Sequence, residues 1–254
     1  MKNVINSSIF RKLLFALTLS ILLTGCASTL PPAETPAKRP VDEYVHKDVV
    51  YTIDVYDPIE GFNRGVYKFN YYFDKYIFLP VVSVYEFILP KFFQDRVSSA
   101  VDNIFEFNNL TNSLLQLEFK KAGITVSRFV INTTFGVLGM FDTAAEAGLQ
   151  RQNEDFGQTL GHYGVGHGPY LVLPVLGPSN LRDTTGLVAD AAAFSYLGPP
   201  AWIDDDDVTL AFNIVTAVDK RHREKFRYYE TGTPFEYDLV RMLYTKKREL
   251  DIAR

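Results

Sequence analysis

The chain has 254 residues, a formal net charge of −4 at pH 7, 47% hydrophobic residues and 14% aromatic residues. This acidic balance argues against nucleic acid as a partner and against a polybasic patch that would bind anionic lipid. Twenty Phe and fifteen Tyr supply many rings of the kind that lie at a water–lipid boundary, although an aromatic soluble core would explain the same composition.

Residues 1–25 have the organisation of a secretory signal peptide. Three cations precede an apolar run, Leu13 to Leu23, and the small residues around "LTGCAS" follow it. The run is shorter than the roughly 20 residues of a membrane-spanning helix. "LTGC" resembles a bacterial lipobox, which predicts cleavage before Cys26 and attachment of lipid to its thiol. A free or disulfide-bonded Cys26 is the alternative, but the chain has no second cysteine to pair with it.

Residues 26–56 are predicted to form the lipidated N-terminus and an extended tether. "ASTLPPAETPAKRP" is rich in Pro and Ala and has no apolar periodicity. Val49 to Ile53 could form a strand, but no partner strand is evident nearby. Ala27 follows the cysteine at the position where, in the lipoproteins that this segment resembles, an aspartate favours retention in the inner membrane. We therefore expect the outer membrane.

The main domain is predicted to span residues 57–254 and to begin with an aromatic helix. Asp57 as N-cap, Pro58 at the first helical position and Glu60 two residues later form a capping pattern. Aromatic and aliphatic residues then recur at helical spacing up to Pro80. Pro80 is expected to end this helix.

This aromatic helix is long enough to cross a bilayer but carries too many charges to do so. It measures about 33 Å at about 1.5 Å per residue. Each central charge costs roughly 2.5–3.5 kcal/mol, whereas each apolar residue gains about 0.3–0.6 kcal/mol. The helix should therefore lie along the membrane interface. The alternative is a buried helix in which Asn63, Arg64 and Asn70 form a polar core network.

Helical periodicity continues to the C-terminus, which predicts an all-α fold of roughly six to eight helices. Asp142 and Ser179 are predicted N-caps, Asp204 to Asp207 are predicted to cap the helix that follows them, and Pro234 is predicted to open the last helix. The remaining expected helices are 81–89, bounded by Pro80 and Pro90, about 96–119, 120–134, 180–194 and 207–230.

Asparagines are dense in the predicted helix near residues 96–119. Two roles fit Asn103, Asn108, Asn109 and Asn112. They could join helices by hydrogen bonds, because buried amides need partners, or they could line a wet passage through an apolar domain. The sequence alone leaves both open.

Patterns typical of catalytic or metal sites are scarce. The sequence has no G-x-S-x-G or H-E-x-x-H motif, and Cys26 is the single cysteine. His162 and His167 flank the glycine-rich "GHYGVGHGPY", but their spacing does not suit a helical metal pair. A tight turn or hairpin is the expected use of this segment. We therefore expect neither an enzyme nor a bound metal or cofactor.

Several ordered motifs resemble the MlaA (VacJ) family of outer-membrane lipoproteins. They are the lipobox, "DPIEGFNRGVYKFN", "NNLTNSLLQ", "SRFVINTTFGVLGMFD", "EDFGQTLGHYGVGHGPYLVLPVLGPSNLRD" and "PFEYDLVRMLYTKKREL". The resemblance is dense from Asp57 to Asp183. Residues 190–230 match in helical character alone, and residues 41–56 lie outside the motifs.

The resemblance implies a ring-shaped helical domain that lies in the inner leaflet of the outer membrane and has a glycine-rich hairpin loop. It implies a lipoprotein that passes mislocalised outer-leaflet phospholipids through an amphipathic channel. The implied partners are a trimeric porin and a periplasmic carrier of an ABC transporter system. A structural scaffold without lipid passage is the alternative. The candidate channel or gate residues are Asn63, Arg64, Asn70, Asn108, Asn112, Gly164, Gly166, His167 and Gly168, in addition to Cys26 as the lipid attachment site.

Overall fold

The computed structural model describes residues 55–202 and 205–253. The predicted signal peptide, Cys26 and the strand predicted at Val49 to Ile53 lie outside the described residues. The described part is predominantly helical, as predicted, with one short hairpin. Its elements are α2 (Glu60–Phe73), a π-helical segment (Asp74–Phe78), α3 (Leu79–Ile88), α4 (Lys91–Leu115), α5 (Phe119–Thr134), α6 (Thr143–Glu146), α7 (Phe156–His162), β1 (Tyr170–Leu173), β2 (Gly177–Asn180), α8 (Leu181–Leu197), a 3-10 turn (Pro199–Trp202), α9 (Asp206–Arg223) and α10 (Glu236–Ile252).

The helix that starts with α2 continues past Pro80, which was expected to end it. The π-helical segment joins α2 to α3 without a break, and Pro80 lies in the first turn of α3. A proline is tolerated there because the first helical N–H groups have no partner within their own helix. Pro90 does mark a boundary, since it is the N-cap of α4.

The predicted cap at Asp57 is wrong, because α2 begins later. Ile59 occupies the N-cap position, and its side chain makes no capping bond. The Asp57 carboxylate instead accepts hydrogen bonds from Asn63, Tyr237 and Arg241. These long-range bonds connect the start of α2 to α10.

The β-hairpin lies directly after the glycine-rich segment. β1 and β2 pair antiparallel, with Tyr170 opposite Asn180 and Leu173 opposite Gly177. The turn between them is Pro174 to Leu176, so the glycine-rich segment leads into the hairpin and does not form its tip. The N-cap of α8 is Asn180, not the predicted Ser179, and its side chain accepts a bond from the Asp183 N–H.

Two of the other predicted caps are confirmed. Asp142 caps α6 by accepting from the Ala145 N–H. Asp205, within the predicted acidic run, caps α9 by accepting from the N–H groups of Asp207 and Val208. Pro234 precedes the last helix, whose N-cap is Phe235.

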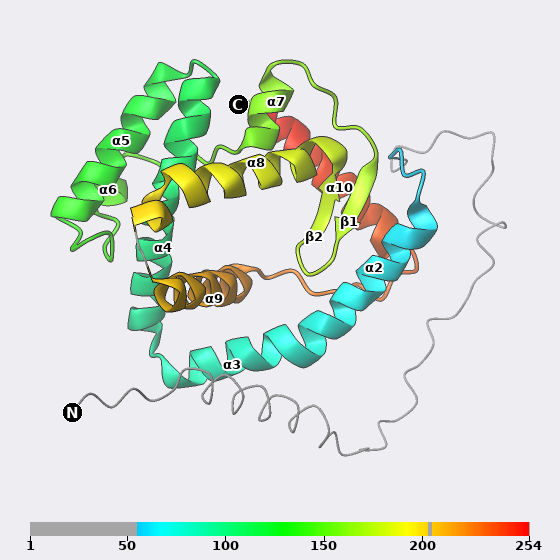
Figure 1. Ribbon diagram of the computed structural model, residues 1–254. Coiled ribbons are helices and arrows are strands. Elements are labelled where there is room, and N and C mark those ends of the chain that lie inside the picture. Colours follow the sequence, from blue (N-terminus) through cyan, green and yellow to red (C-terminus); the bar gives the residue numbers. More distant parts are fainter. Residues whose placement is uncertain (1–54, 203–204, 254) are drawn as a thin grey trace. The chain divides into compact units, whose positions relative to one another are not determined.

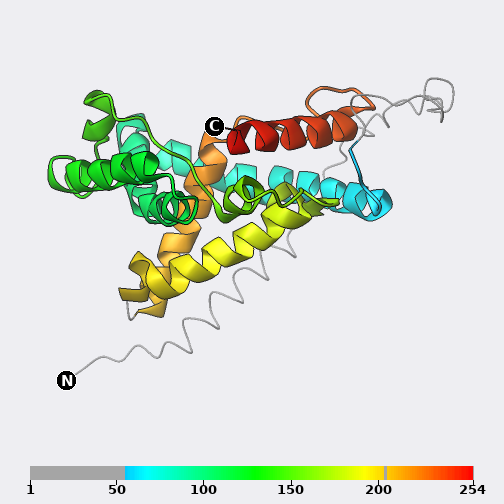
Figure 2. The same cartoon turned by 90° about the horizontal axis from the view of Figure 1, so that it is seen from above.

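The helices of this domain pack around a common interior. α4 contacts α5, α7, α8 and α9, and α3 contacts α9. α7 packs against α8 and α10, while the hairpin contacts α2, α8 and α10. Figure 1 shows α2 and α3 continuing into α4, with α8 on the opposite side of α9 from α3. In the view from above, α10 (red) and α8 (yellow) lie on opposite sides of α2 and α3 (Figure 2).

The distribution of polarity is inverted relative to an ordinary water-soluble domain. Arg128, Glu106, Asn63 and Asn112 are among the most deeply buried side chains, and the apolar core cluster beneath the hairpin is small. Large apolar side chains are instead exposed along several helices, for example Phe87, which is 91% exposed. This number of exposed large apolar side chains suits a domain that contacts lipid or protein.

Helix α2 shows the same inversion in detail. Its buried positions are Asn63, Tyr67 and Asn70, whereas Phe62 and Phe69 are exposed. The aromatic stripe that the sequence presents therefore faces outward, and a polar stripe faces the domain interior. This arrangement suits a helix that lies along a membrane interface.

Membrane crossing by one helix is not supported in the described part of the chain. No single helix there has both the length and the apolar composition to cross a bilayer. Residues 60–88 and 91–115 meet both criteria only as a pair, and that pair is bent by 118°.

Candidate functional site

Two predicted asparagines fasten α2 to the hairpin, in what we call the asparagine clamp (Asn63 and Asn70). The Nδ2 of Asn63 donates to Asp57 and to the Tyr170 carbonyl, at 2.7 and 3.0 Å, and its Oδ1 accepts from the Val172 N–H at 3.0 Å. Asn70 bonds the hairpin in the same two-sided way, through Leu173 and Val175. Both side chains thus have their partners within the protein, in hairpin backbone groups and the Asp57 carboxylate, and neither lines the cavity described below.

Arg64 is also held by protein groups. Its guanidinium contacts Glu60 at 2.6 Å and Asp238 at 3.1 Å, and it lies 4.2 Å from the centre of the Tyr237 ring. These contacts tie α2 to α10. Arg64 is likewise absent from the cavity lining.

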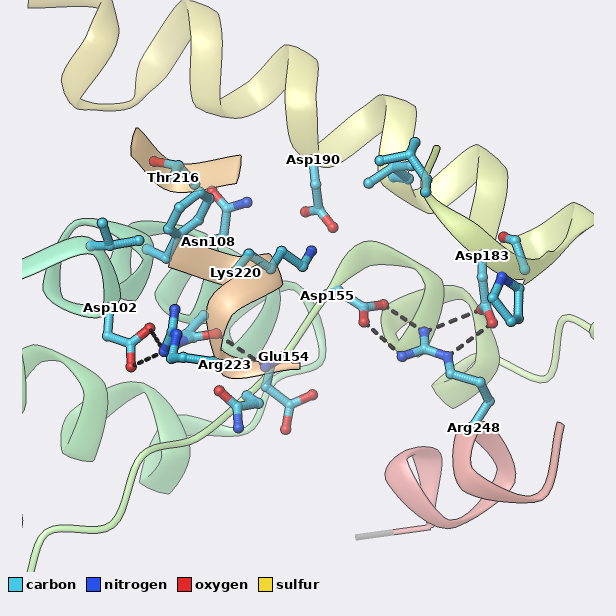
Figure 3. Close-up of a pocket in the computed structure, with 18 of the residues that line it drawn as sticks. Asp102, Asn108, Glu154, Asp155, Asp183, Asp190, Thr216, Lys220, Arg223 and Arg248 are labelled. Carbon is cyan, nitrogen blue, oxygen red and sulfur yellow. Dashed lines mark hydrogen bonds and ion pairs between the residues drawn. The ribbon is translucent and has the colours of Figure 1, made fainter. Parts of the chain in front are cut away.

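A cavity of about 570 Å³ lies among α4, the segment before α7, the hairpin, α8, α9 and α10. Apolar residues such as Phe105 and Leu187 share its wall with many charged groups. Figure 3 shows this wall. Its charged residues are Asp102, Arg151, Glu154, Asp155, Asp183, Asp190, Lys220, Arg223 and Arg248.

The asparagines of α4 divide between the two roles that the sequence left open. Asn108 lines the cavity, and its buried Oδ1 has no hydrogen-bond partner among the described residues. Asn112 is fully buried and joins helices, since it donates to Asp190 at 2.8 Å and accepts from Thr159 at 2.9 Å. Asn109 also borders the cavity and accepts from the Glu154 N–H. Asn103 donates to Thr133 and does not line the cavity.

Arg248 joins three helices at one end of the cavity. It contacts Asp155, the N-cap of α7, at 2.7 Å and Asp183 in the first turn of α8 at 2.8 Å. Burial alone would raise the pKa of both carboxyls, but bonding to Arg248 outweighs burial and holds each pKa below its ordinary value. Both carboxylates therefore stay charged at neutral pH.

A second set of ion pairs lies at the other end. Asp102 accepts from Arg151 at 2.6 Å and from Arg223 at 2.9 Å, and so joins α4 to α9. Glu154 pairs with Lys121 at 2.8 Å. These bonds fix the wall around the charged cavity.

Asp190 differs from the other carboxyls of the wall. It accepts from the Asn112 side chain and from the Phe156 N–H, both at 2.8 Å. Burial and the nearby Asp155 charge raise its pKa above the ordinary value, despite these two bonds. No cation pairs with it in the described part of the chain.

A second hollow, of about 640 Å³, lies beyond the segment that precedes α7. It is lined mainly by polar residues, including Lys121, Gln158 and Asp251. The two hollows share a border made of Arg151, Asn153, Glu154, Asp155 and Arg248.

The glycine-rich segment lies away from both hollows. Gly164 and Gly168 have φ of +83° and +66°, a backbone region that favours glycine, and a Cβ on Gly168 would come within 3.2 Å of Leu181. His167 contacts the Gly168 carbonyl at 2.6 Å. Gly166 has open space around its Cα. The glycines of this segment therefore permit its backbone conformation and its close contact with Leu181. Their role as a gate stays a prediction.

The charged residues of the cavity were not singled out by sequence reasoning. Asp190, Lys220 and Arg223 lie where the sequence offered helical character alone, and Arg248 lies in the last helix. The run of cations at 220–223 was the available signal, but a run of this kind usually lies on a solvated face. No group of three or more potential metal ligands occurs in residues 55–202 and 205–253.

Comparison with known proteins identifies relatives along most of the chain. A family model described as MlaA lipoprotein matches residues 55–251. An uncharacterised protein of Rickettsia prowazekii is 39% identical over 191 residues, which cover 71% of this chain and 74% of that protein. The intermembrane phospholipid transport system lipoprotein MlaA of Haemophilus influenzae is 35% identical over 215 residues, which cover 83% of this chain and 78% of the relative.

The lipoprotein of the same name from Escherichia coli K12 is 39% identical over 138 residues, which cover 53% of this chain and 55% of the relative. A chain in a solved structure described as "Structural basis for maintenance of bacterial outer membrane lipid asymmetry" matches with a TM-score of 0.64 and 29% identity. That match covers 78% of this chain and all of the solved chain.

Proposed function

Because the chain belongs to the MlaA lipoprotein family, we propose that it transports phospholipid and maintains outer-membrane lipid asymmetry. Mislocalised phospholipids leave the outer leaflet through the polar interior of the domain and pass to a periplasmic carrier protein of an ABC transporter system. The relatives named as phospholipid transport lipoproteins support phospholipid as the cargo, and the similar solved structure, which concerns outer-membrane lipid asymmetry, supports the role in asymmetry.

One observation carries this proposal: a charged cavity lies inside a domain whose outer surface exposes aromatic and aliphatic side chains. A phospholipid head group needs polar surroundings, because an unsolvated charge in hydrocarbon costs many kcal/mol. A cavity of about 570 Å³ with charged groups on several walls offers such surroundings. The exposed apolar side chains suit the acyl region of one leaflet.

The predicted lipobox and the family support the location that we propose. Cys26 carries the lipid anchor, residues 1–25 are removed as a signal peptide, and the domain lies in the inner leaflet of the outer membrane, facing the periplasm. Two or more acyl chains anchor a protein stably, whereas one chain binds marginally. A trimeric porin of the outer membrane is the proposed neighbour in that leaflet.

The transport needs no chemical reaction on the lipid. The domain acts as a passive conduit, so the net direction of flow depends on the relative stability of lipid on each side and on the energy supplied by the carrier system. We accordingly propose that the protein is not an enzyme. Phospholipid incubated with it should keep its acyl chains and head group unchanged by mass spectrometry.

A cell-based experiment tests the passage. Deletion of the gene in its own host should raise the phosphatidylethanolamine that an impermeant, amine-reactive reagent labels on intact cells. The wild-type gene should reverse the rise. Thr216→Phe, which places a ring in the cavity wall, should not, whereas Val215→Phe at the neighbouring exposed position should. Cys26→Ala should also fail, because the anchor is lost.

The alternative function is a lipoprotein scaffold that recruits partners and moves no lipid. A scaffold would keep working when its cavity is filled. Normal labelling in cells that carry Thr216→Phe, with normal amounts of the variant in the outer membrane, would therefore reject lipid passage and favour the scaffold.

A further inference from the structure

Four basic residues follow one another at the end of α9, and one of them differs from the rest. Lys220 lines the cavity and forms no hydrogen bond or ion pair with any residue that the structure describes. The other three are each engaged by a carboxylate: Arg221 by Asp74 at 2.5 Å, His222 by Glu86 at 2.6 Å, and Arg223 by Asp102 at 2.9 Å. The ammonium of Lys220 is thus available to a ligand in the cavity.

Among the carboxylates that line the cavity, Asp190 likewise has no ion-pair partner in the described part of the chain. Asp102, Glu154, Asp155 and Asp183 each have a lysine or arginine within ion-pair distance. Asp190 has only the Asn112 amide and the Phe156 N–H as partners within residues 55–202 and 205–253. These direct partners are neutral donors, so no cation lies at ion-pair distance from Asp190 in that part of the chain, although Arg248 acts on it electrostatically from farther away. Burial makes such a charge costly.

Lys220 and Asp190 face the same space from two different helices. Figure 3 shows the Lys220 side chain, from α9, and the Asp190 carboxylate, from α8, both directed into the cavity. The two groups do not form an ion pair with each other. Asn108 and Thr216 border the same space, and their buried Oδ1 and Oγ1 atoms also lack partners in the described part of the chain.

We propose that Lys220 and Asp190 form a recognition site for a zwitterionic lipid head group that carries a phosphate diester and a primary ammonium. The phosphate lies at Lys220, with the Thr216 hydroxyl as a donor. The ammonium of the lipid lies at Asp190, with the side-chain Oδ1 of Asn108 as a second acceptor. This inference rests on the proposed lipid passage and specifies which lipid that passage prefers.

Charge complementarity gives such a site selectivity. A phosphoethanolamine head compensates both unpaired charges, whereas an anionic phosphoglycerol head compensates Lys220 and leaves its hydroxyls beside the Asp190 charge. Discrimination arises from such a difference between two partners and not from affinity for one of them. A difference of one charge-assisted hydrogen bond corresponds to about a tenfold preference, since about 1.4 kcal/mol is tenfold in binding.

The test measures which lipid the protein retains. Full-length lipidated protein in mild detergent is incubated with an equimolar mixture of phosphatidylethanolamine and phosphatidylglycerol, purified again, and its bound lipid is quantified by mass spectrometry. The wild type should retain about ten times more phosphatidylethanolamine. Asp190→Asn should reduce this ratio to about one. Lys220→Met should reduce binding of both lipids severalfold, because both contain the phosphate.

Control variants change the same charges outside the cavity. Asp207→Asn and Lys225→Met alter exposed residues that do not line it, and both should behave like the wild type. Helical circular dichroism and the thermal midpoint show whether Asp190→Asn and Lys220→Met remain folded. We expect them to fold, because neither change removes an ion pair.

The outcomes separate this inference from the proposed function. Retention of both lipids without preference, unchanged in both variants, would overturn the head-group site and leave lipid passage intact. Absence of retained lipid from all proteins would overturn both. A further arm adds soluble glycerophosphoethanolamine without lipid: its stoichiometric retention, while neither lipid is retained, would show that the cavity serves a soluble phosphodiester and would overturn the lipid site.

Discussion

The asparagine clamp and the cavity wall contain the same types of polar residue but use them differently. In the clamp, the amide atoms of Asn63 and Asn70 are matched by backbone or carboxylate partners from the hairpin and Asp57. In the wall, Lys220 and Asp190 lack counter-charges among the described residues, and the Oδ1 of Asn108 lacks a hydrogen-bond partner there. A polar residue on an apolar helix therefore indicates a site only when its partners are missing.

The difference has a physical cause in the surroundings of each region. Asn63 is completely buried against the hairpin, where an unmatched amide would cost the full desolvation penalty. The cavity is large enough for water or a ligand, which can satisfy groups that the protein leaves unmatched. Substitutions in the two regions should accordingly have opposite consequences for stability.

The largest effect is expected in the clamp. Asn63→Ala leaves the Tyr170 carbonyl, the Val172 N–H and one Asp57 oxygen without their partner. We expect a loss of about 4 kcal/mol in the free energy of unfolding, since each unmatched buried group costs about 1–3 kcal/mol. Urea unfolding of the purified protein in mild detergent, followed by circular dichroism, measures it.

Asn108→Ala is the matched control for this change, and it should cost less than about 1 kcal/mol, because the Oδ1 it removes has no partner to lose. Equal losses in the two variants would show that the clamp and the cavity wall do not differ as described.

The next largest effect is expected at the junction of α7, α8 and α10. Arg248→Met leaves Asp155 and Asp183 without their main cation. We expect a cost of about 3 kcal/mol, which comes mainly from the buried pair with Asp183, because the Asp155 side chain is partly exposed. Lys247→Met, at an exposed neighbour, should cost less than about 0.5 kcal/mol. The same urea unfolding compares the two variants, and a loss below about 1 kcal/mol for Arg248→Met would contradict the assigned role.

Acid should remove part of the stability that this junction supplies. Because Arg248 lowers the folded-state pKa of Asp155 and Asp183, their contribution is complete above about pH 5 and is lost as the pH falls through the folded pKa values. Arg248→Met should show a weaker decline in unfolding free energy between about pH 5 and pH 3 than the wild type. Parallel declines in the two proteins would place the titrating groups elsewhere.

The smallest effect, and of the opposite sign, is expected from the unpaired charges. Asp190→Asn removes a partly buried charge that has no ion-pair partner in the described part of the chain, so stability should stay unchanged or rise by about 0.5 kcal/mol. Lys220→Met changes an exposed residue and should leave stability unchanged. Thermal unfolding of the lipid-free proteins measures this. A loss above about 2 kcal/mol in either variant would reveal a partner that the described geometry does not contain.

Much of the helical framework was predictable because its signals are local. Asp142 and the acidic run near Asp205 supply carboxylates that bond the first N–H groups of their own helices. Pro90 separates two helices, as expected. At Asp142 the local cap forms even though Arg128 and Asn132 also bond the same carboxylate.

The wrong boundaries have long-range causes. Asp57 has the sequence context of an N-cap, but Tyr237 and Arg241, from the far end of the chain, occupy its carboxylate. Pro80 continues the helical path because the π-helical segment before it places the proline in a first turn. Neither effect can be foreseen without knowing which segments meet.

The sequence predicted that polar residues lie inside an apolar domain, but it did not predict most of the residues that line the cavity. Asn108 lies on the cavity wall, whereas Asn63 and Asn70 belong to the clamp and Arg64 to contacts with α10. The sequence does not distinguish among the four adjacent basic residues of α9, and only the fold shows that three of them contact a carboxylate. The unpaired state of Lys220 and Asp190 is a property of tertiary structure.

The two hollows share a border that consists of a short stretch of irregular chain, 151–155, together with the side chain of Arg248. Ion pairs hold this stretch at three points: Arg151 to Asp102, Glu154 to Lys121 and Asp155 to Arg248. The two hollows are therefore separated by paired charges and not by a packed apolar layer.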